Sequence, residues 1–377
     1  MKERIDIVVP DAVLAENDAK RKLLDAVWKR GRPQRVPVLA GESQYLCLDA
    51  RGRTFGQYVR SPVDNLREQI LNRKWRIESV RDDMPIPTGT LSFRPDMGTL
   101  RGTEFEMEIV WQEDGAPKCL HPLHELEDVD RLGVPPPDGA LNAKYIDWYH
   151  KMRHAAEDFD VRVNGSPLKI EVTLAQGGGP IPAAFALAGE NFFLWTLEDP
   201  ARAHRLMDIV TTSHLNCLEF FDRMVGRDPR HSIWMGCDTA EMLSPAMFRE
   251  FVVPYYLRVW EKYPGPPRSF HMCGKTDHLL AIIRDELKIT DMDVIGSVTD
   301  RHKAADALAG RVFLKGGPEP LLICKGDRET ITRECVSYIE IMGRHGGFVL
   351  VPGGGPVPGT PVEHFAWMVE ASKQAAG

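Results

Sequence analysis

Short apolar stretches rich in β-branched residues alternate with amphipathic stretches along this 377-residue chain, most clearly in its second half. Strands that alternate with helices predict βα units and a parallel sheet. The candidate strands are Arg35–Ala40, Pro87–Phe93, Val161–Gly165, Ser232–Cys237, Ser269–Cys273, Asp291–Gly296, Arg311–Gly316 and Gly347–Pro352. Eight such units predict an α/β fold, a (β/α)8 TIM barrel that forms a single domain over residues 1–377.

Helical patterns follow the later strands. Ser244–Val252 begins like a capped helix, because Ser244 precedes a proline at the first helical position. Glu329–Ile341 has apolar residues at helical spacing. Pro361–Lys373 is predicted to close the chain as a final helix.

The first half of the chain is less regular. Glu104–Trp111 alternates in polarity and could form a hairpin across Glu113–Gly115, and Pro135–Gly139 reads as a surface loop. We therefore expect an insertion between strands two and three. We also expect residues 1–34 to be a helical extension of the barrel.

Composition excludes several classes of partner. The net charge of −7 gives no basic surface for nucleic acid, and no apolar run approaches the roughly 20 residues that cross a membrane. The seven cysteines are odd in number and scattered, which favours a reducing, cytoplasmic setting over a disulfide framework.

The stretch Arg268–Gly274 carries the most chemistry. Residues two apart on a strand point the same way, so His271 and Cys273 would share one face at the strand's end. An imidazole beside a thiol is half of a zinc site. Cys237, at the end of the preceding strand, is the best candidate for a third ligand, with Asp238 and Glu241 as alternatives. In a metal-free interpretation the pair lines a pocket.

Other strand ends carry candidate substrate-binding and catalytic groups. Glycines there could offer backbone N–H groups to an anion or admit a flat ligand, and in a second interpretation they are tight turns that need positive φ. Acids there could act as general acids or bases, although helix capping is their commoner role. The candidates are Asp238 and Glu319 for catalysis, and Asp96, Gln176, Asp300, Gly316, Gly317 and Gly354 for substrate binding.

Several of these motifs together resemble the uroporphyrinogen decarboxylase superfamily. The resembling segments are Leu243–Tyr256, Phe270–Gly274, Gly316–Pro320, Pro352–Glu363 and, more weakly, Arg32–Val38. The resemblance implies a (β/α)8 barrel. It also implies one of two activities: cofactor-independent decarboxylation of uroporphyrinogen, a porphyrin precursor, or methyl transfer between corrinoid (cobalamin-bearing) proteins and acceptors.

The His-x-Cys pair is closest to the zinc-dependent methyltransferases of that superfamily, where it supplies two ligands and a later cysteine supplies the third. His271 and Cys273 match the pair, but Gly354 stands where the third ligand is expected. The decarboxylase pattern is broken as well. Its paired arginines after the first strand are missing, since Arg51 and Arg53 come later and at another spacing.

The leading hypothesis is therefore a methyltransferase that moves a methyl group between a corrinoid protein and a thiol or tetrahydrofolate bound at the barrel mouth. The chain has no corrinoid-binding Asp-x-His-x-x-Gly motif, so the corrinoid would arrive on a partner. Zinc is the expected metal. A decarboxylase of a polycarboxylate and a non-catalytic ligand-binding barrel are the alternatives. Dimers occur in the superfamily, which leaves room for a homodimer.

Overall fold

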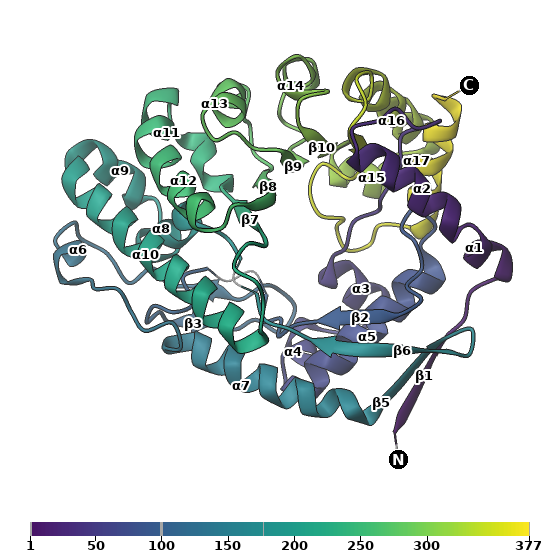
Figure 1. Ribbon diagram of the computed structural model, residues 1–377, viewed down its shortest axis with the longest axis horizontal. Helices are drawn as coiled ribbons and strands as arrows, with labels where there is room; N and C mark the ends of the chain where they lie inside the picture. The colour runs from purple at the N-terminus through teal and green to yellow at the C-terminus, as the bar shows by residue number, and fades with distance from the viewer. Residues whose placement is uncertain (1, 99–100, 176, 377) are drawn as a thin grey trace.

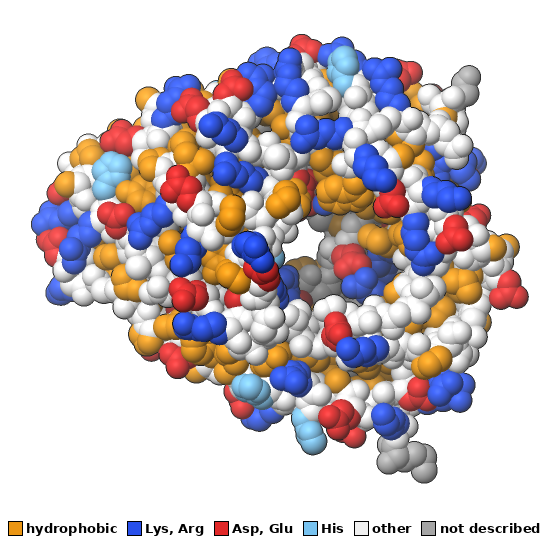
Figure 2. Space-filling view, viewed as in Figure 1, with side chains coloured by type: hydrophobic (Ala, Val, Ile, Leu, Met, Phe, Trp, Pro, Cys, Tyr) orange, Lys and Arg blue, Asp and Glu red, His pale blue; other side chains and the backbone are white. Residues whose placement is uncertain are grey.

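The computed structural model describes residues 2–98, 101–175 and 177–376. The elements are arranged as a ring in which the helices of the second half lie outside the strands, and the space-filling view is open at the centre of this ring (Figure 1, Figure 2). The purple N-terminal segment reaches across to the yellow C-terminal helix on one side of the ring (Figure 1). No helix among the described residues is long and apolar enough to cross a membrane.

The second half of the chain forms a five-stranded sheet in which every strand is parallel to its neighbours. Its strands are β7 (Ser232–Gly236), β8 (Gly265–Met272), β9 (Asp291–Ile295), β10 (Phe313–Gly316) and β11 (Phe348–Leu350), in the spatial order β11-β10-β9-β8-β7. The last five predicted strands are confirmed. Parallel order brings all five carboxyl ends to one edge, which is where polar residues had been expected to meet.

The first half forms a four-stranded mixed sheet in the order β1-β5-β6-β2. Its strands are β1 (Glu3–Ile7), β2 (Thr90–Phe93), β5 (Phe159–Val163) and β6 (Ser166–Val172). The third predicted strand, Val161–Gly165, coincides with β5 over residues 161–163 but extends two residues too far. Asn164 and Gly165 have φ of 44° and 82° and turn the chain, so β5 runs antiparallel to β6. An Asn-Gly pair is a strong hairpin signal, and β6 is the strand that pairs in parallel with β2.

The first predicted strand, Arg35–Ala40, is reduced to an isolated parallel bridge between Val38 and Leu350 of β11. At the far edge of the five-stranded sheet, the amide of Gly236 donates to the carbonyl of Gly178 at 2.6 Å. The hydrogen bonds among the described residues thus define two principal sheets. The segments around Val38 and Gly178 are joined to the two edges of the five-stranded sheet by the contacts just described. A closed eight-stranded barrel stays a prediction.

Helices connect and cover these strands. They are α1 (Asp11–Ala15), α2 (Asn17–Trp28), α3 (Gln44–Ala50), α4 (Phe55–Tyr58), α5 (Pro62–Ser79), α6 (Asp128–Arg131), α7 (Ala140–Ala155), α8 (Pro180–Ala188), α9 (Asn191–Glu198), α10 (Pro200–Val225), α11 (Pro245–Phe251), α12 (Val253–Lys262), α13 (Leu280–Asp285), α14 (Arg301–Leu308), α15 (Pro320–Lys325), α16 (Arg328–Met342) and α17 (Val362–Gln374). The three helices predicted from the sequence correspond to α11, α16 and α17. The hydroxyl of Ser244 caps α11, as expected.

Two smaller expectations had mixed outcomes. The segment 1–34, predicted to be helical, begins with β1 before α1 and α2 follow. The predicted hairpin is present but short, with β3 (Ile109–Val110) antiparallel to β4 (Lys118–Cys119). Short 3-10 helices at Ala156–Asp158 and Asp238–Met242 complete the fold.

The main hydrophobic core lies between the five-stranded sheet and its helices. Phe270 and Met272 of β8 are fully buried there, and Phe270 packs edge-on against Tyr256 and Trp260 of α12. The alternate residues of β8 must then point to the opposite side, toward the centre of the ring. This alternation is what presents His271 to the interior.

Candidate functional site

Three side chains that can ligate a metal converge at the carboxyl ends of β7 and β8, and we call them the strand-end cluster. They are Asp238, His271 and Cys273, and one ligand atom from each lies within 4.8 Å of the others. Residue Gly236 of β7 is in register with His271 of β8, so the chain leaving β7 passes beside the imidazole. Two neighbouring parallel strands therefore supply all three groups.

The backbone fixes one member of the cluster. The amide N–H of Cys273 donates to Oδ1 of Asp238 at 2.9 Å, and the same oxygen lies 3.5 Å from Nε2 of His271. The side chain of Asp238 is about half exposed, whereas that of His271 is only 19% exposed. The cluster therefore has a buried imidazole at its base and opens toward solvent at the carboxylate.

The other imidazole nitrogen faces a second carboxylate. Nδ1 of His271 lies 3.6 Å from Oδ2 of Asp293 on β9. Asp293 is held from both sides, because the indole N–H of Trp234 donates to Oδ2 at 2.9 Å and the ammonium of Lys315 donates to Oδ1 at 2.5 Å. A carboxylate anchored in this way favours the tautomer with its proton on Nδ1, which leaves Nε2 to the cluster.

These contacts change the acidity of the groups. Burial opposes a charge on His271, but interactions with Asp293, Cys273 and Asp238 outweigh it and raise the pKa of the imidazole to about 10. Burial also opposes a charge on Asp293, but its contacts with His271, Lys315 and Trp234 hold its pKa well below the usual range. Without a metal, the centre of the site is thus an imidazolium paired with carboxylates.

The donor set suits zinc. Imidazole nitrogen, thiolate sulfur and carboxylate oxygen are its protein ligands, and catalytic sites use three of them while leaving a further position for substrate. His271, Cys273 and Asp238 supply one of each, and Asp293 would be the outer partner that ligating histidines usually have. Binding must displace the proton of His271, so a metal competes with protons here.

The predicted third ligand, Cys237, lies elsewhere. Its thiol is completely buried in the main core beside Tyr256, and burial raises the pKa of the thiol far above its usual value. Cys237 lies two residues after the buried Met235 of β7 and packs in the same core, whereas Asp238 begins the 3-10 helix Asp238–Met242 and lies beside His271. The structure brings Asp238 into the cluster in its place.

The other two acids at strand ends are not part of the cluster. Asp300 caps α14 by accepting from the amides of His302 and Lys303 at 2.9 and 3.2 Å, and these backbone hydrogen bonds lower the pKa of its carboxyl. This is the commoner role of such an acid, and substrate binding by Asp300 finds no support. Glu319 is exposed at the start of α15 and makes no capping hydrogen bond.

Close backbone packing explains Gly317 among the candidate glycines of the last strand ends. A Cβ on Gly317 would lie 2.0 Å from the carbonyl oxygen of Val351. One on Gly354 would lie 3.3 Å from Cγ of Pro320. Gly316, Gly317 and Gly354 all lack a positive φ, so the expectation of positive-φ turns is wrong at these positions. Gln176 lies outside the described residues.

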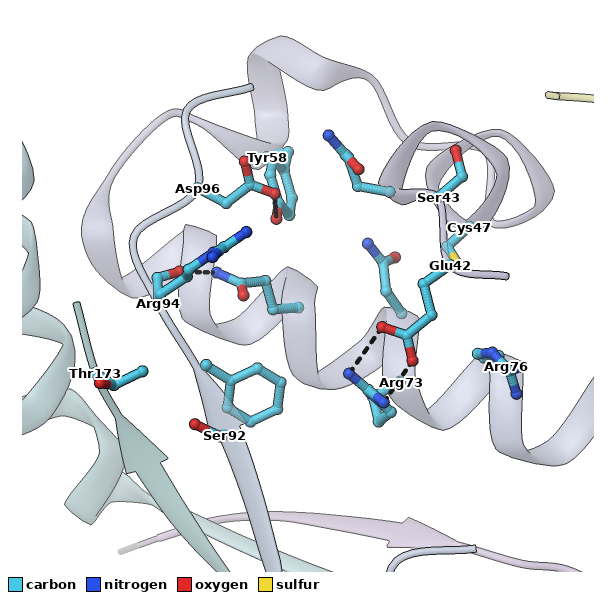
Figure 3. A pocket seen from close by; sticks show the side chains of 14 residues that line it. Glu42, Ser43, Cys47, Tyr58, Arg73, Arg76, Ser92, Arg94, Asp96 and Thr173 are labelled. Carbon is cyan, nitrogen blue, oxygen red and sulfur yellow. Dashed lines mark hydrogen bonds and ion pairs between the residues drawn. The ribbon is translucent and has the colours of Figure 1, made fainter. Parts of the chain in front are cut away.

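Asp96 lines a separate cavity of about 480 Å³ between α3, α5 and the end of β2, which we call the arginine cavity (Figure 3). The hydroxyl of Tyr58 donates to Oδ2 of Asp96 at 2.7 Å, and the amide of Gly98 donates to Oδ1 at 2.9 Å. Both oxygens of Asp96 are thus already engaged. These two hydrogen bonds fix the position of the carboxylate.

Three arginines also line this cavity (Figure 3). Arg73 forms a bidentate pair with Glu42, and Arg76 bonds to Asp82 at 2.6 Å. Arg94 makes no side-chain ion pair with another described residue. Most of the positive charge is therefore already neutralised by the protein's own carboxylates.

Sequence reasoning missed Asp293, Lys315 and Trp234. The sequence does contain a usable pattern. On its strand, each of these residues occupies one of the alternating positions that point to the centre of the ring, as His271 does on β8. A charged residue inside an otherwise apolar strand needs a partner. Asp293 and Lys315, on adjacent predicted strands, were candidates for such a pair.

Comparison with known proteins defines the class. The family model described as uroporphyrinogen decarboxylase (URO-D) matches residues 99–375. The chain therefore belongs to the uroporphyrinogen decarboxylase family, and the resemblance seen in its motifs is confirmed. An enzyme of this superfamily is the coarse conclusion that the comparisons support.

Particular relatives refine this picture. A uroporphyrinogen decarboxylase of Anaeromyxobacter sp. is 27% identical over 278 residues, which cover 71% of this chain and 73% of that protein. One from Xanthomonas campestris pv. campestris is 27% identical over 286 residues, covering 70% and 74%. Among solved structures, a methyltransferase from Methanosarcina mazei superposes with a TM-score of 0.66 at 17% identity, over 95% of this chain and 99% of that one. This last likeness establishes the fold alone.

Proposed function

We propose that this protein is a methyltransferase that moves a methyl group between a corrinoid carried by a partner protein and a small acceptor, a thiol or tetrahydrofolate. The observation that carries the proposal is the strand-end cluster, in which Asp238, His271 and Cys273 offer three different donor atoms within 4.8 Å of one another. The acceptor would bind beside this cluster, at the carboxyl edge of the five-stranded sheet.

A metal fits this role better than general acid–base chemistry does. Bound zinc supplies a positive charge that keeps a thiol deprotonated near neutral pH. His271, Cys273 and Asp238 would hold it, and Asp293 would keep Nε2 of His271 directed at it. Trp234 packs against His271 with ring centroids 5.5 Å apart and shields the imidazole from water.

The second candidate is decarboxylation of uroporphyrinogen or a related polycarboxylate, favoured by the names of the sequence relatives. Substrate carboxylates need free arginines. In the arginine cavity Arg73 and Arg76 are paired with Glu42 and Asp82, and Asp96 is hydrogen-bonded through both oxygens. Among the described residues that line the cavity, this leaves Arg94 as the one arginine without an ion pair, which is few for a substrate with many carboxylates. Methyl transfer therefore remains the better-supported function.

The deciding experiment incubates the purified, zinc-supplemented protein with methylcobalamin and either a small thiol or tetrahydrofolate. Methylated acceptor and demethylated corrinoid are then measured. We expect transfer by the wild type and none by His271→Ala, while His302→Ala, an exposed histidine on α14, keeps full activity. No transfer to any acceptor, together with carbon dioxide release from uroporphyrinogen, would establish the second candidate instead. Ligand binding without any turnover would indicate a non-catalytic barrel.

A further inference from the structure

Cys273 lies one residue beyond the end of β8, which stops at Met272. The hydrogen-bond ladder of the sheet therefore does not fix its main chain, although its thiol is one of the three groups of the strand-end cluster. A turn of the main chain at this residue would carry the sulfur away from His271. The direction of the thiol must then depend on what holds residues 273–276, which we call the Cys273 loop.

Side chains from the short 3-10 helix after β7 hold this loop on one side. Asp238 accepts from the amide of Cys273 at 2.9 Å, and Oε2 of Glu241 accepts from the amide of Lys275. The glycine at position 274 makes this approach possible, since a Cβ on Gly274 would lie 2.2 Å from Oε2 of Glu241. One turn of helix therefore holds two alternate amides of the Cys273 loop.

Thr299, which follows β9, holds the loop on the other side. Its hydroxyl donates to the carbonyl of Gly274 at 2.9 Å and accepts from the amide of Thr276 at 3.0 Å. Thr299 is 3% exposed and Thr276 is fully buried, so water does not compete for these hydrogen bonds. The main chain is tightly packed as well, because a Cβ on Gly296 would lie 1.6 Å from the carbonyl oxygen of Cys273.

We propose that Glu241 and Thr299 are positioning residues that keep the thiol of Cys273 directed at the strand-end cluster. Because the loop is held from both sides, the sulfur is in place before a metal binds, and the cost of ordering the loop does not oppose binding. Glu241, a possible ligand by its sequence position, bonds to the main chain of the loop and is not one of the three clustered groups. This inference rests on the proposed function only in taking the cluster as a metal site.

The test of Thr299 uses the full-length protein and Co²⁺, which accepts the same kinds of ligand as zinc and absorbs light by charge transfer from a bound thiolate. Thr299→Val removes the hydroxyl at nearly unchanged shape. We expect it to lose most of this absorption and to bind cobalt about 10- to 100-fold more weakly than the wild type. Thr299→Ser returns the hydroxyl and should restore both. Thr90→Val, at an exposed threonine on β2, is the matched control.

The test of Glu241 should show a smaller effect, because this carboxylate is exposed and water can replace it. Glu241→Ala should weaken cobalt binding by about 3- to 10-fold, the cost of one hydrogen bond. Glu241→Gln keeps an acceptor oxygen and should bind as the wild type does. Glu261→Ala, at an exposed glutamate on α12, is the matched control. Circular dichroism and thermal unfolding show that each variant is folded before cobalt is added.

Several results would overturn the inference. One is a folded Thr299→Val or Glu241→Ala variant that keeps the affinity and the thiolate absorption of the wild type. A Thr299→Val variant that is only less stable, with the absorption intact, would give Thr299 a structural role alone. A wild type that binds no cobalt would remove the metal site itself. By contrast, a wild type that shows the thiolate absorption but transfers no methyl group would contradict the proposed function and leave this inference standing.

Discussion

The strand-end cluster and the arginine cavity are both polar, but they use their charges differently. In the arginine cavity Arg73, Arg76 and Asp96 are engaged with other protein groups. In the cluster Nδ1 of His271 faces Asp293 at 3.6 Å, while Nε2 and the Cys273 thiol remain directed at a shared space. Polarity alone therefore does not locate a reactive site. A better indicator is a set of ligand atoms that converge on one point and are not already engaged by other protein groups.

The largest expected effect is on metal content. His271→Ala and Cys273→Ala should each reduce bound zinc from roughly one per chain to near zero, because two protein ligands do not hold zinc. His302→Ala and Cys324→Ala are matched controls outside the cluster and should keep it. Metal analysis after expression in zinc-supplemented medium measures this. A wild type free of zinc would remove the metal from the proposed function.

The next effect tests Asp238 against the residue that sequence reasoning preferred. Asp238→Ala should lower zinc affinity by at least about 100-fold, more than an outer partner would. Cys237→Ala should leave affinity unchanged, because that thiol lies in the core. Competition titration with a chelating dye gives both values. If the Cys237→Ala variant folded fully but lost its zinc, this would contradict the assignment of Asp238 as the third ligand.

A smaller effect is expected from the orienting carboxylate. Asp293→Asn should weaken zinc binding by about 10- to 100-fold, the usual cost of losing an outer-shell partner. Asp291→Asn is the matched control. Asp291 lies two residues before Asp293 on β9, and its carboxylate accepts a hydrogen bond from Ser269 of β8. In the metal-free protein, the nitrogen chemical shifts of His271 should show that Asp293→Asn lowers the pKa of the imidazole. An unchanged pKa and an unchanged zinc affinity would assign Asp293 a structural role only.

Zinc affinity should change with pH by about tenfold per unit for the one proton that His271 must release. Since the pKa of His271 is raised from 6.5 to about 10, the metal-free folded chain keeps a proton that the unfolded chain loses. Zinc affinity should therefore rise as pH rises between these values. The stability of the metal-free protein depends on pH in the opposite direction. The stabilisation that comes from the raised pKa of His271 is complete below about pH 6.5 and is lost as the pH approaches 10. Chelator titrations and denaturant unfolding across pH 6–9 measure both trends, and a flat profile would contradict them.

The smallest effect concerns the arginine cavity. Tyr58→Phe removes the hydrogen bond to Asp96 and should cost about 1–2 kcal/mol of unfolding free energy without changing zinc content. Denaturant unfolding measures the cost. A loss of metal in this variant would show that the two regions are coupled, against the contrast drawn above.

The sequence was most informative where geometry is local. Alternation along β8 placed His271 and Cys273 on one side, and the last five strands followed from their apolar runs. It was weaker where tertiary contacts decide. Val38 forms only a single bridge with Leu350, so its apolar run looked like a strand without being one. The turn at Asn164–Gly165 was visible in the sequence but was overlooked.

Roles that depend on the orientation of neighbouring strands could not be assigned in advance. Cys237 and Asp238 are adjacent in sequence, and only the packing of Cys237 beside Tyr256 decides which of them faces His271. The trio of Trp234, Asp293 and Lys315 spans three strands and depends on their relative register. Register between parallel strands is set by packing across the whole sheet.

Asp238 is held in place by the main chain of residue 273 and not by its sulfur. The carboxylate would therefore keep its position if serine, aspartate or histidine replaced the cysteine. Such a replacement would exchange a soft donor for a harder one while the rest of the cluster stayed in register. In the proposed metal site, a substitution at this single position would thus change the metal preference without rebuilding the surrounding loops.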